Sequence, residues 1–586
     1  MVKVEKNKKH KADICVIGGG LAGMCAAIAA ARRGSRVILV HDRPVFGGNC
    51  SSEIRMWPMG AGGSNRRETG IFEELVLNNM YRNPTRNYPI WDSVLFEAVR
   101  FQPRLESLLN CTVNDIEMSD KNHIKAVYGW QLTTYQTHYI EADIFIDCSG
   151  DSILAELSGA EYRHGREARE DYGEDAAPET ADRQTMGNSC LLQVRETAEP
   201  IKFIPPEWAR KIPDDENLKT RDHMPDSYRG NNFWWLELGG NKDTIEDAEE
   251  IRDDLLALSL GVWDHIKNQG DHNAENWELD WAGFLPGKRE SRRYIGDHIL
   301  TQREVQEGGK FEDIVAYGGW QIDNHPPMGF DHKGDPTTYY PCPSPFGIPY
   351  RCLYSANIDN LMFAGRNISA THAAMAASRV MATCAMLGQA TGTAASLAVK
   401  KHILPRKVNE FIPELQQHLM EDDCWLPGLR RKVSEDCLSA ELKAECENPE
   451  NLRNGIDRPT DEGGDNGCFV SLNSDITYTL NSSSYIENVH IVFDSDLNRD
   501  TVKGGIPSVK DCPTICNRPL DLKGFSFPST VTKKFELIAD GEIIYSTDCN
   551  HQRFLKISVA RTVKTLTLRP IATFGAETAH IFSFDF

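Results

Sequence analysis

The feature that most constrains this chain of 586 residues is a glycine-rich turn between an apolar strand and a helix of small residues. Three glycines come after the strand at residues 13–17 in the spacing G-x-G-x-x-G: Gly18, Gly20 and Gly23. The first two allow a sharp turn and the close approach of a pyrophosphate, and the third lets helix and strand pack closely. The helix N-terminus favours the phosphate charge. Since a second apolar strand comes next at residues 37–40, the stretch predicts a dinucleotide-binding domain.

The residues after the second strand indicate the type of dinucleotide. An acidic residue that binds the adenosine ribose is expected about 20 residues past the glycines. The strand ends in His41 and Asp42, so we assign this role to Asp42, one position later than in the common pattern. Gly47 and Gly48 then form a second glycine turn.

With both turns, the segment resembles the glutathione-reductase-type superfamily of flavoproteins with two dinucleotide folds. The resemblance implies FAD as the cofactor, and the alternative is an NAD-binding Rossmann domain with incidental glycines. The FAD contacts that it implies here are Gly18, Gly20, Leu21, Ala22, Gly23, His41, Asp42, Arg43, Gly47, Gly48 and Asn49.

Two later segments resemble further FAD-contacting parts of this superfamily. Residues 142–151 and 360–372 each predict a strand that ends in a turn. The implied contacts are Ser149, Gly150, Asp151, Gly365 and Arg366. A helix of small residues is then expected from about Ser378 to Lys400. Its N-terminus can stabilise negative charge on a reduced flavin, or its small residues only permit close helix packing, and both interpretations can hold together.

Charge and cysteine content exclude several classes of function. Lys and Arg number 64 against 85 Asp and Glu, a net charge of −21 without a basic stripe, which argues against nucleic-acid partners. None of the sixteen cysteines forms a C-x-x-C pair, so no metal or iron–sulfur site is predicted. Cys50 resembles the redox segment of disulfide reductases, but Arg55 stands where the second cysteine is required. The closest spacing, Cys512 to Cys516, has no partner cluster nearby.

The N-terminal lysines before the first apolar stretch do not indicate a cleavable signal, because that stretch is the dinucleotide unit itself. No membrane span is predicted, and we expect a cytoplasmic protein.

The expected fold class is α/β: a Rossmann-like FAD-binding domain with an inserted α+β substrate domain, and then an all-β sandwich. The FAD-binding domain is expected to be discontinuous, at residues 1–155 and 340–405. Residues 156–339, rich in Trp and charge, predict the substrate domain, including a helix at 243–268 that begins with an Asp-Thr cap.

Residues 406–464 are expected to be helical and charged at first and a linker from residue 450. The short alternating runs of residues 465–586 favour strands, and the pattern resembles galactose-binding-like jelly rolls. That resemblance makes carbohydrate a candidate partner of this segment. It also fits a packing or dimer module, and the oligomeric state stays open.

Further strings resemble one bacterial family of FAD-dependent oxidoreductases across residues 12–400, among them Gly47–Arg55, Lys288–Arg293 and the segment Asn324–Pro327. Flavin chemistry needs a proton donor or acceptor and groups that fix the substrate. His325, before two prolines, is the first candidate for the proton role, and His372 is the second. Candidate cations that hold substrate or catalyse are Arg289, Arg292, Arg293, Arg351 and Arg366. Each histidine has an ordinary structural interpretation as well, and clustered arginines usually pair with Asp or Glu.

We therefore expect an FAD-dependent oxidoreductase that transfers a hydride between flavin N5 and a small polar metabolite such as a sugar or sugar derivative. One alternative is fumarate-reductase-like reduction of an activated double bond. Another is a non-redox lyase or isomerase with structural FAD.

Overall fold

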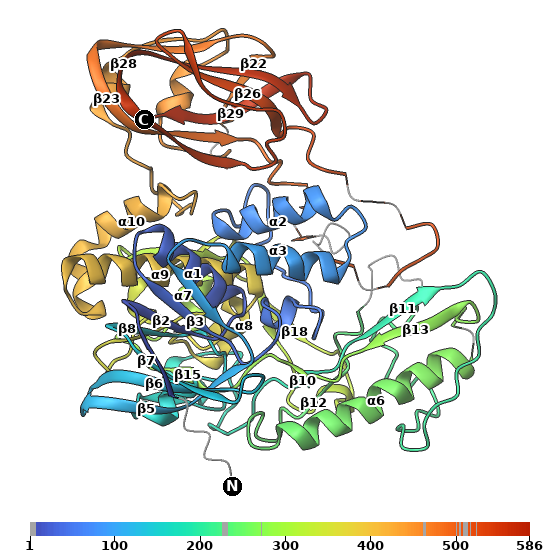
Figure 1. The fold of residues 1–586 in the computed structure, drawn as a ribbon. Coiled ribbons are helices and arrows are strands. Elements are labelled where there is room, and N and C mark those ends of the chain that lie inside the picture. The colour runs from blue at the N-terminus through green and yellow to red at the C-terminus, as the bar shows by residue number, and fades with distance from the viewer. Residues whose placement is uncertain are drawn as a thin grey trace.

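The computed structural model describes residues 7–225, 232–270, 272–460, 464–499, 501–502, 506–507, 514–515, 517–522, 524 and 526–586 (Figure 1). Cys512 and Cys516, the closest-spaced cysteines, lie outside the described residues.

A five-stranded parallel sheet forms the centre of the first half of the fold. Its strands lie in the order β20 (Leu361–Phe363), β8 (Ile144–Asp147), β2 (Ile14–Ile17), β3 (Val37–Val40) and β4 (Leu105–Leu108). Every residue of β2, β3, β8 and β20 is buried, as expected for parallel strands that are covered on both faces. The strands predicted around residues 14, 37, 144 and 361 are therefore confirmed, and all four join one sheet.

Helix α1 (Leu21–Arg32) packs against α9 (Met381–Lys401), which comes directly after α8 (His372–Ser378). A β-carbon on Gly388 or Gly392 of α9 would overlap the backbone of α1. The small residues of α9 thus permit close packing of the two helices, which is one of the two interpretations that the sequence left open for this helix. Met381 and Cys384, at the start of α9, also line the cavity described below.

Helices α2 (Ile71–Arg82) and α3 (Tyr88–Arg100) lie between β3 and β4 in the chain. A four-stranded sheet comes next, in the order β1 (Asn7–Lys11), β7 (Gln136–Glu141), β6 (His123–Gln131) and β5 (Cys111–Asp120). Short helices α4 (Ile153–Ser158) and α5 (Arg169–Tyr172) come after β8.

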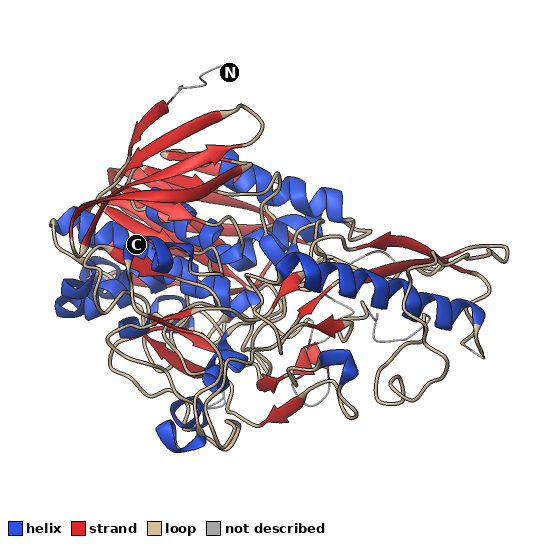
Figure 2. Ribbon diagram, turned by 90° about the horizontal axis from the view of Figure 1, so that it is seen from below, coloured by secondary structure: helices blue, strands red, loops and turns tan. Residues whose placement is uncertain are grey.

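The inserted region combines short strands with one long helix, α6 (Ala248–Asn268). The helix begins five residues later than predicted, because Asp243 forms a turn in which its carboxylate accepts hydrogen bonds from the Ile245 and Glu246 amides. The paired strands are β12 (Glu237–Leu238), β10 (Asn188–Ser189) and β14 (Gly287–Lys288) in one sheet, and β11 (Leu192–Glu196) with β13 (Trp277–Ala282) in another. Figures 1 and 2 both show α6, β11 and β13 extending to one side of the molecule.

Three further strand pairs and a short helix complete this half. They are β9 (Tyr162–Arg163) with β15 (Arg293–Tyr294), β16 (Ile314–Gly318) with β19 (Phe346–Pro349), β17 (Ile322–Asn324) with β18 (Thr338–Tyr340), and α7 (Gln302–Gln306).

The C-terminal region is one antiparallel sheet, at the top of Figure 1. Its strands are β22 (Cys468–Ser471), β29 (Thr578–Asp585), β23 (Ile476–Phe493), β28 (Phe554–Thr573), β26 (Thr532–Ala539) and β27 (Glu542–Thr547), with β21 (Glu441–Lys443) on β23. The expected all-β region is confirmed, but β23 and β28 span 18 and 20 residues and are not short. The jelly-roll likeness and carbohydrate binding stay predictions.

The segment expected to be a linker is packed against the rest of the protein. Arg458 is only 1% exposed, and its guanidinium donates to the Arg67 carbonyl and the Thr69 hydroxyl. Before it lie α10 (Ile412–Met420) and α11 (Glu435–Ser439), the helices of the charged segment. A sequence rich in Gly and Asp can form an ordered loop when a buried side chain anchors it, and composition alone does not show this.

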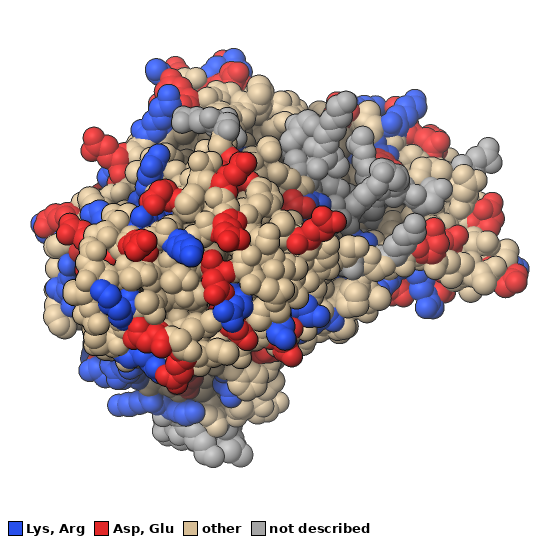
Figure 3. All heavy atoms as spheres, turned by 90° about the horizontal axis from the view of Figure 1, so that it is seen from above, with Lys and Arg blue, Asp and Glu red and all other residues tan. Residues whose placement is uncertain are grey.

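On the face drawn in Figure 3, acidic and basic side chains are intermingled. Within the described ranges, no helix combines the length and the apolar character that a membrane crossing requires.

Candidate active site

A cavity of about 680 Å³ opens beside the glycine turn. All the predicted cofactor contacts except Gly23 line it, together with residues from the inserted region. Segments that lie far apart in the sequence therefore meet in one place, which the local motifs alone did not establish.

The glycine turn has the backbone that its spacing predicts. Gly18 adopts a φ of +99°, and a β-carbon there would overlap the Cys148 carbonyl. A β-carbon on Gly23 would overlap the Gly18 carbonyl oxygen, so Gly23 sets the close contact between helix and strand instead of lining the cavity. Gly20 forms a parallel bridge with Gly47, which brings the two glycine turns side by side. Gly20 is also the N-cap of α1, and glycine has no side chain that could accept hydrogen bonds from the first turn. The backbone amides at the helix N-terminus therefore remain available to an anion.

The His41 side chain holds the glycine turn in place. The Gly19 amide donates to His41 Nδ1 over 2.9 Å, and His41 Nε2 lies 3.0 Å from the Val45 carbonyl, to which it donates. Asp42, at the cavity wall, is about half exposed and available to a ribose. Burial alone raises the pKa of Asp42, but the nearby Arg43 guanidinium lowers it, so Asp42 is a carboxylate.

Asp151 connects three segments around the cavity. Its carboxylate lies 2.7 Å from Lys288 Nζ and 2.8 Å from Arg366 Nη2, and it accepts a hydrogen bond from the Ser291 hydroxyl over 2.8 Å. Burial opposes ionisation, but Arg366 and Lys288 outweigh it and lower the pKa of Asp151 to about 2. Asn49 Nδ2 donates to the Lys288 carbonyl over 3.0 Å, so the same segment is tied to the second glycine turn.

His325 lies in the cavity wall and is 3% exposed. Its Nδ1 is 2.6 Å from Glu237 Oε2 and its Nε2 is 3.2 Å from Asp323 Oδ1, while Trp234 packs edge-on against the ring. Burial alone raises the pKa of Asp323, yet His325 and Arg379 lower it far below its usual range. The ring is thus oriented by ionised carboxylates, which suits a group that holds a proton.

The other predicted side chains separate into two groups. Arg289, Arg292 and Arg366 line the cavity. Arg289 donates to the Ser189 hydroxyl and the Trp234 carbonyl, and Arg292 lies 3.1 Å from Glu156.

The second group lies outside the cavity lining: His372, Arg293 and Arg351. His372 contacts Glu290 and Asn324, Arg293 is buried between Glu167 and Glu290, and Arg351 pairs with Asp313. The catalytic or substrate-binding role of these three residues therefore stays a prediction.

Sequence reasoning missed Asn188. This residue of β10 is fully buried and lines the cavity, and both its amide atoms lack a hydrogen-bond partner in the part of the chain that the structure describes. Arg366 Nε and Arg379 Nε are also buried in the cavity wall, and they too lack a hydrogen-bond partner among the described residues. No local motif marks Asn188, since β10 has only two residues and is held by strands distant in sequence.

A profile of the family described as FAD dependent oxidoreductase matches residues 13–419. The chain belongs to this family. It is an FAD-dependent oxidoreductase, and FAD is its cofactor. The residues fit the group: two adjacent glycine turns leave room for a diphosphate, and Asn188 and Arg366, whose buried polar atoms lack partners among the described residues, line the same cavity.

A solved structure to which the chain is similar is that of a geranylgeranyl bacteriochlorophyll reductase-like protein from Thermoplasma acidophilum, at 11% identity and a TM-score of 0.30, over 71% of this chain and 86% of that one. A single-residue mutant of the E. coli quinol fumarate reductase FrdA is also similar, at 12% identity and a TM-score of 0.27, over 70% of this chain and 75% of that one. Such low TM-scores add nothing about function. No curated protein matches the chain significantly.

Proposed function

We propose that the protein transfers a hydride between flavin N5 and a small polar metabolite, a sugar or sugar derivative, bound beside His325. The observation that carries the proposal is the position of His325 in the wall of the cavity that the glycine turns also line. When bound, the flavin supplies the hydride acceptor or donor.

His325 holds and moves the proton in this scheme. Its Nδ1 is tied to Glu237 at 2.6 Å, whereas the contact of Nε2 with Asp323 is longer, at 3.2 Å. Nε2 is therefore the atom that exchanges a proton with a substrate oxygen, and Glu237 keeps the ring in place. For the oxidation of an alcohol, the imidazole would first release its Nε2 proton, and the hydroxyl proton would then move to Nε2 as the hydride leaves the carbon.

Asn188 orients the substrate. A buried amide with two unpartnered atoms offers one donor and one acceptor direction, which matches a hydroxyl group that both donates and accepts. Trp234, Trp320 and Tyr339 also line the cavity. Aromatic faces beside polar groups match a polyhydroxylated carbon ring, which has apolar C–H faces and polar edges.

A reductase acting on an anionic double-bonded substrate is the second candidate, and the cationic groups favour it. Arg289, Arg366 and Arg379 line the cavity, and guanidinium groups bind carboxylates in a fixed geometry. In that case His325 Nε2 would deliver a proton to the carbon next to the one that accepts the hydride.

The experiment is an anaerobic titration monitored by the flavin absorption near ~450 nm. Bleaching by one sugar, polyol or 2-hydroxy acid supports the oxidation, and its loss in His325→Gln with retained flavin supports the proton role. Consumption of a reduced dye with an enoate, and no bleaching by any alcohol, would move the assignment to the reductase. Turnover without any change in flavin absorbance would contradict both and indicate a non-redox reaction.

A further inference from the structure

A long irregular segment runs over helix α6 of the inserted region. Between the end of β11 at Glu196 and the start of β12 at Glu237, the described residues contain no helix or strand. Irregular segments of this length are uncommon in compact folds unless something holds them in place. Leu218 is fully buried in the apolar cluster against α6, and the backbone amides of Thr197, Ile201 and Arg210 donate to carbonyls of residues 257–276.

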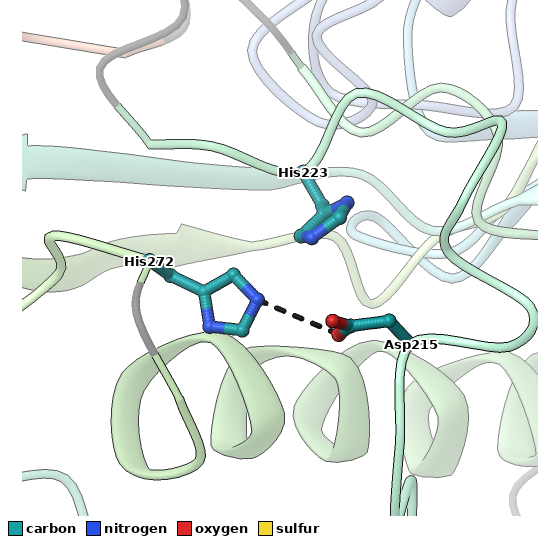
Figure 4. A group of neighbouring side chains, drawn as sticks. All are labelled: Asp215, His223 and His272. Atoms are coloured by element: carbon teal, nitrogen blue, oxygen red, sulfur yellow. Dashed lines mark ion pairs between the residues drawn. The ribbon is translucent and has the colours of Figure 1, made fainter.

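Three side chains of this area converge at one point: Asp215, His223 and His272 (Figure 4). The first two come from the irregular segment, and His272 lies just past the end of α6. One potential ligand atom from each lies within 4.8 Å of the others, and His272 Nε2 is 3.6 Å from Asp215 Oδ1. In a tetrahedral zinc site with bonds of ~2.1 Å, two ligand atoms lie about 3.4 Å apart. Small side-chain rotations would bring the three ligand atoms of this cluster to that spacing.

The tautomer of His223 suits a metal ligand. Its Nδ1 lies 2.7 Å from the Arg221 carbonyl oxygen, and a carbonyl can only accept, so Nδ1 carries the hydrogen. The lone pair of the ring is therefore on Nε2. A ligating histidine commonly donates its other N–H to a backbone carbonyl in this way.

His272 is a buried imidazole. It is 6% exposed, and its Nδ1 has no hydrogen-bond partner among the described residues. A buried polar atom of this kind usually binds a water molecule or an ion.

His265 of α6 orients the carboxylate. Its Nδ1 donates to the Ile212 carbonyl over 3.0 Å, and its Nε2 lies 2.7 Å from Asp215 Oδ1. That separation is too short for two ligands of one ion, so His265 acts through Asp215 and is a positioning residue.

We propose that Asp215, His223 and His272 form a binding site for a divalent transition metal of the zinc class, with His265 orienting Asp215. Imidazole and carboxylate donors suit zinc, and the exposed side of Asp215 leaves a fourth position for water. The ion cross-links the irregular segment to the end of α6. The site is separate from the flavin cavity, whose lining includes none of the four residues.

The test uses the flavin-loaded full chain without an affinity tag, stripped with EDTA and titrated with ZnCl2 by calorimetry. We expect one zinc per chain, and a loss of affinity of at least tenfold in Asp215→Asn, His223→Gln and His272→Gln. His265→Gln should weaken binding less. His332→Gln is the matched control, because it changes an exposed histidine of the same region. Retained flavin absorption shows that each variant is folded.

A second measurement needs no variant. Hydrogen exchange of the peptide spanning residues 212–223 in the wild-type protein should slow at least tenfold when one equivalent of ZnCl2 is added. Uptake below a tenth of an equivalent, affinity unchanged in Asp215→Asn and His272→Gln, or equal loss in His332→Gln would each overturn the proposal. None of these results depends on the substrate of the flavin site.

Discussion

His325 Nδ1 lies 2.6 Å from Glu237 Oε2, and both side chains are almost fully buried. Glu237 also accepts a hydrogen bond from the Gly187 amide over 2.7 Å and lies 3.4 Å from Arg289. One carboxylate thus orients the proposed proton-transfer group and fixes the strand that carries Asn188 next to it.

Replacing His325 by Gln should lower kcat roughly 100-fold, because a positioned acid or base contributes about 10²–10⁴. Glu237→Gln should lower kcat about tenfold with little change in KM, because the His325 ring loses the carboxylate that orients it. Steady-state kinetics measure both. Glu250→Gln on the exposed face of α6 is the control, and an unchanged kcat in Glu237→Gln would contradict the role of this pair.

Gly23→Ala should abolish FAD binding or folding, because the added methyl group overlaps the Gly18 carbonyl oxygen under the turn. Gly34→Ala is the comparison: its φ is +98°, but no atom lies within 4 Å of the new methyl group. We expect that variant to lose only about 1 kcal/mol of stability and to keep its flavin. Flavin-to-protein absorbance ratios after gel filtration measure the difference, and a normal ratio in Gly23→Ala would refute the packing argument.

Asp151→Asn should reduce FAD retention, because Arg366 and Lys288 lose their shared anion at the cavity wall. Because hydrogen bonds to charged groups are lost, the free energy of unfolding of Asp151→Asn should be lower by about 2 kcal/mol. Denaturant unfolding and the dissociation constant of FAD from the deflavinated chain test this. Asp297→Asn, which removes a partner of Arg406 outside the cavity, should leave FAD affinity unchanged.

The contact between α2 and the C-terminal region should make stability depend on pH. Burial opposes ionisation of Glu73, but Arg499 and Arg67 lower its pKa from 4.5 to about 2. The ionised Glu73 carboxylate therefore stabilises the fold fully above pH ~4.5. As the pH falls toward 2, Glu73 is protonated and the free energy of unfolding decreases by roughly 3 kcal/mol.

Unfolding measured between pH 6 and 3 should show this loss in the wild type and a weaker dependence in Glu73→Gln, which is already destabilised at pH 6. Glu74→Gln is the control on the same helix, because Glu74 pairs with Arg32 at the surface. Parallel pH curves for the wild type and Glu73→Gln would contradict the assignment.

The sequence predicted the cofactor half of the site well because its constraints are local. A β-carbon on Gly23 would overlap the Gly18 carbonyl of the same turn, and Gly18 and Gly47 have the positive φ values that their turns require. The strands next to the first turn are continuous apolar runs. The substrate half was not predictable in the same way. Asn188 faces the cavity only because β10 pairs with β12 and β14, each about 50 to 100 residues away. Arg351 pairs with Asp313 and Arg293 with Glu167, carboxylates of other segments that no spacing rule identifies, although Arg293 also contacts Glu290 three residues earlier.

The parallel sheet also has a consequence for synthesis on the ribosome. Its edge strand β20 begins about 210 residues after β8 ends, and α9, which packs against α1, comes later still. At ~5–20 residues per second, translation leaves Ile144–Asp147 without its second neighbour for roughly 10–40 s. During that interval the nascent chain has an unpaired apolar strand edge. We therefore expect chaperone dependence and aggregation during expression to increase with the length of this delay.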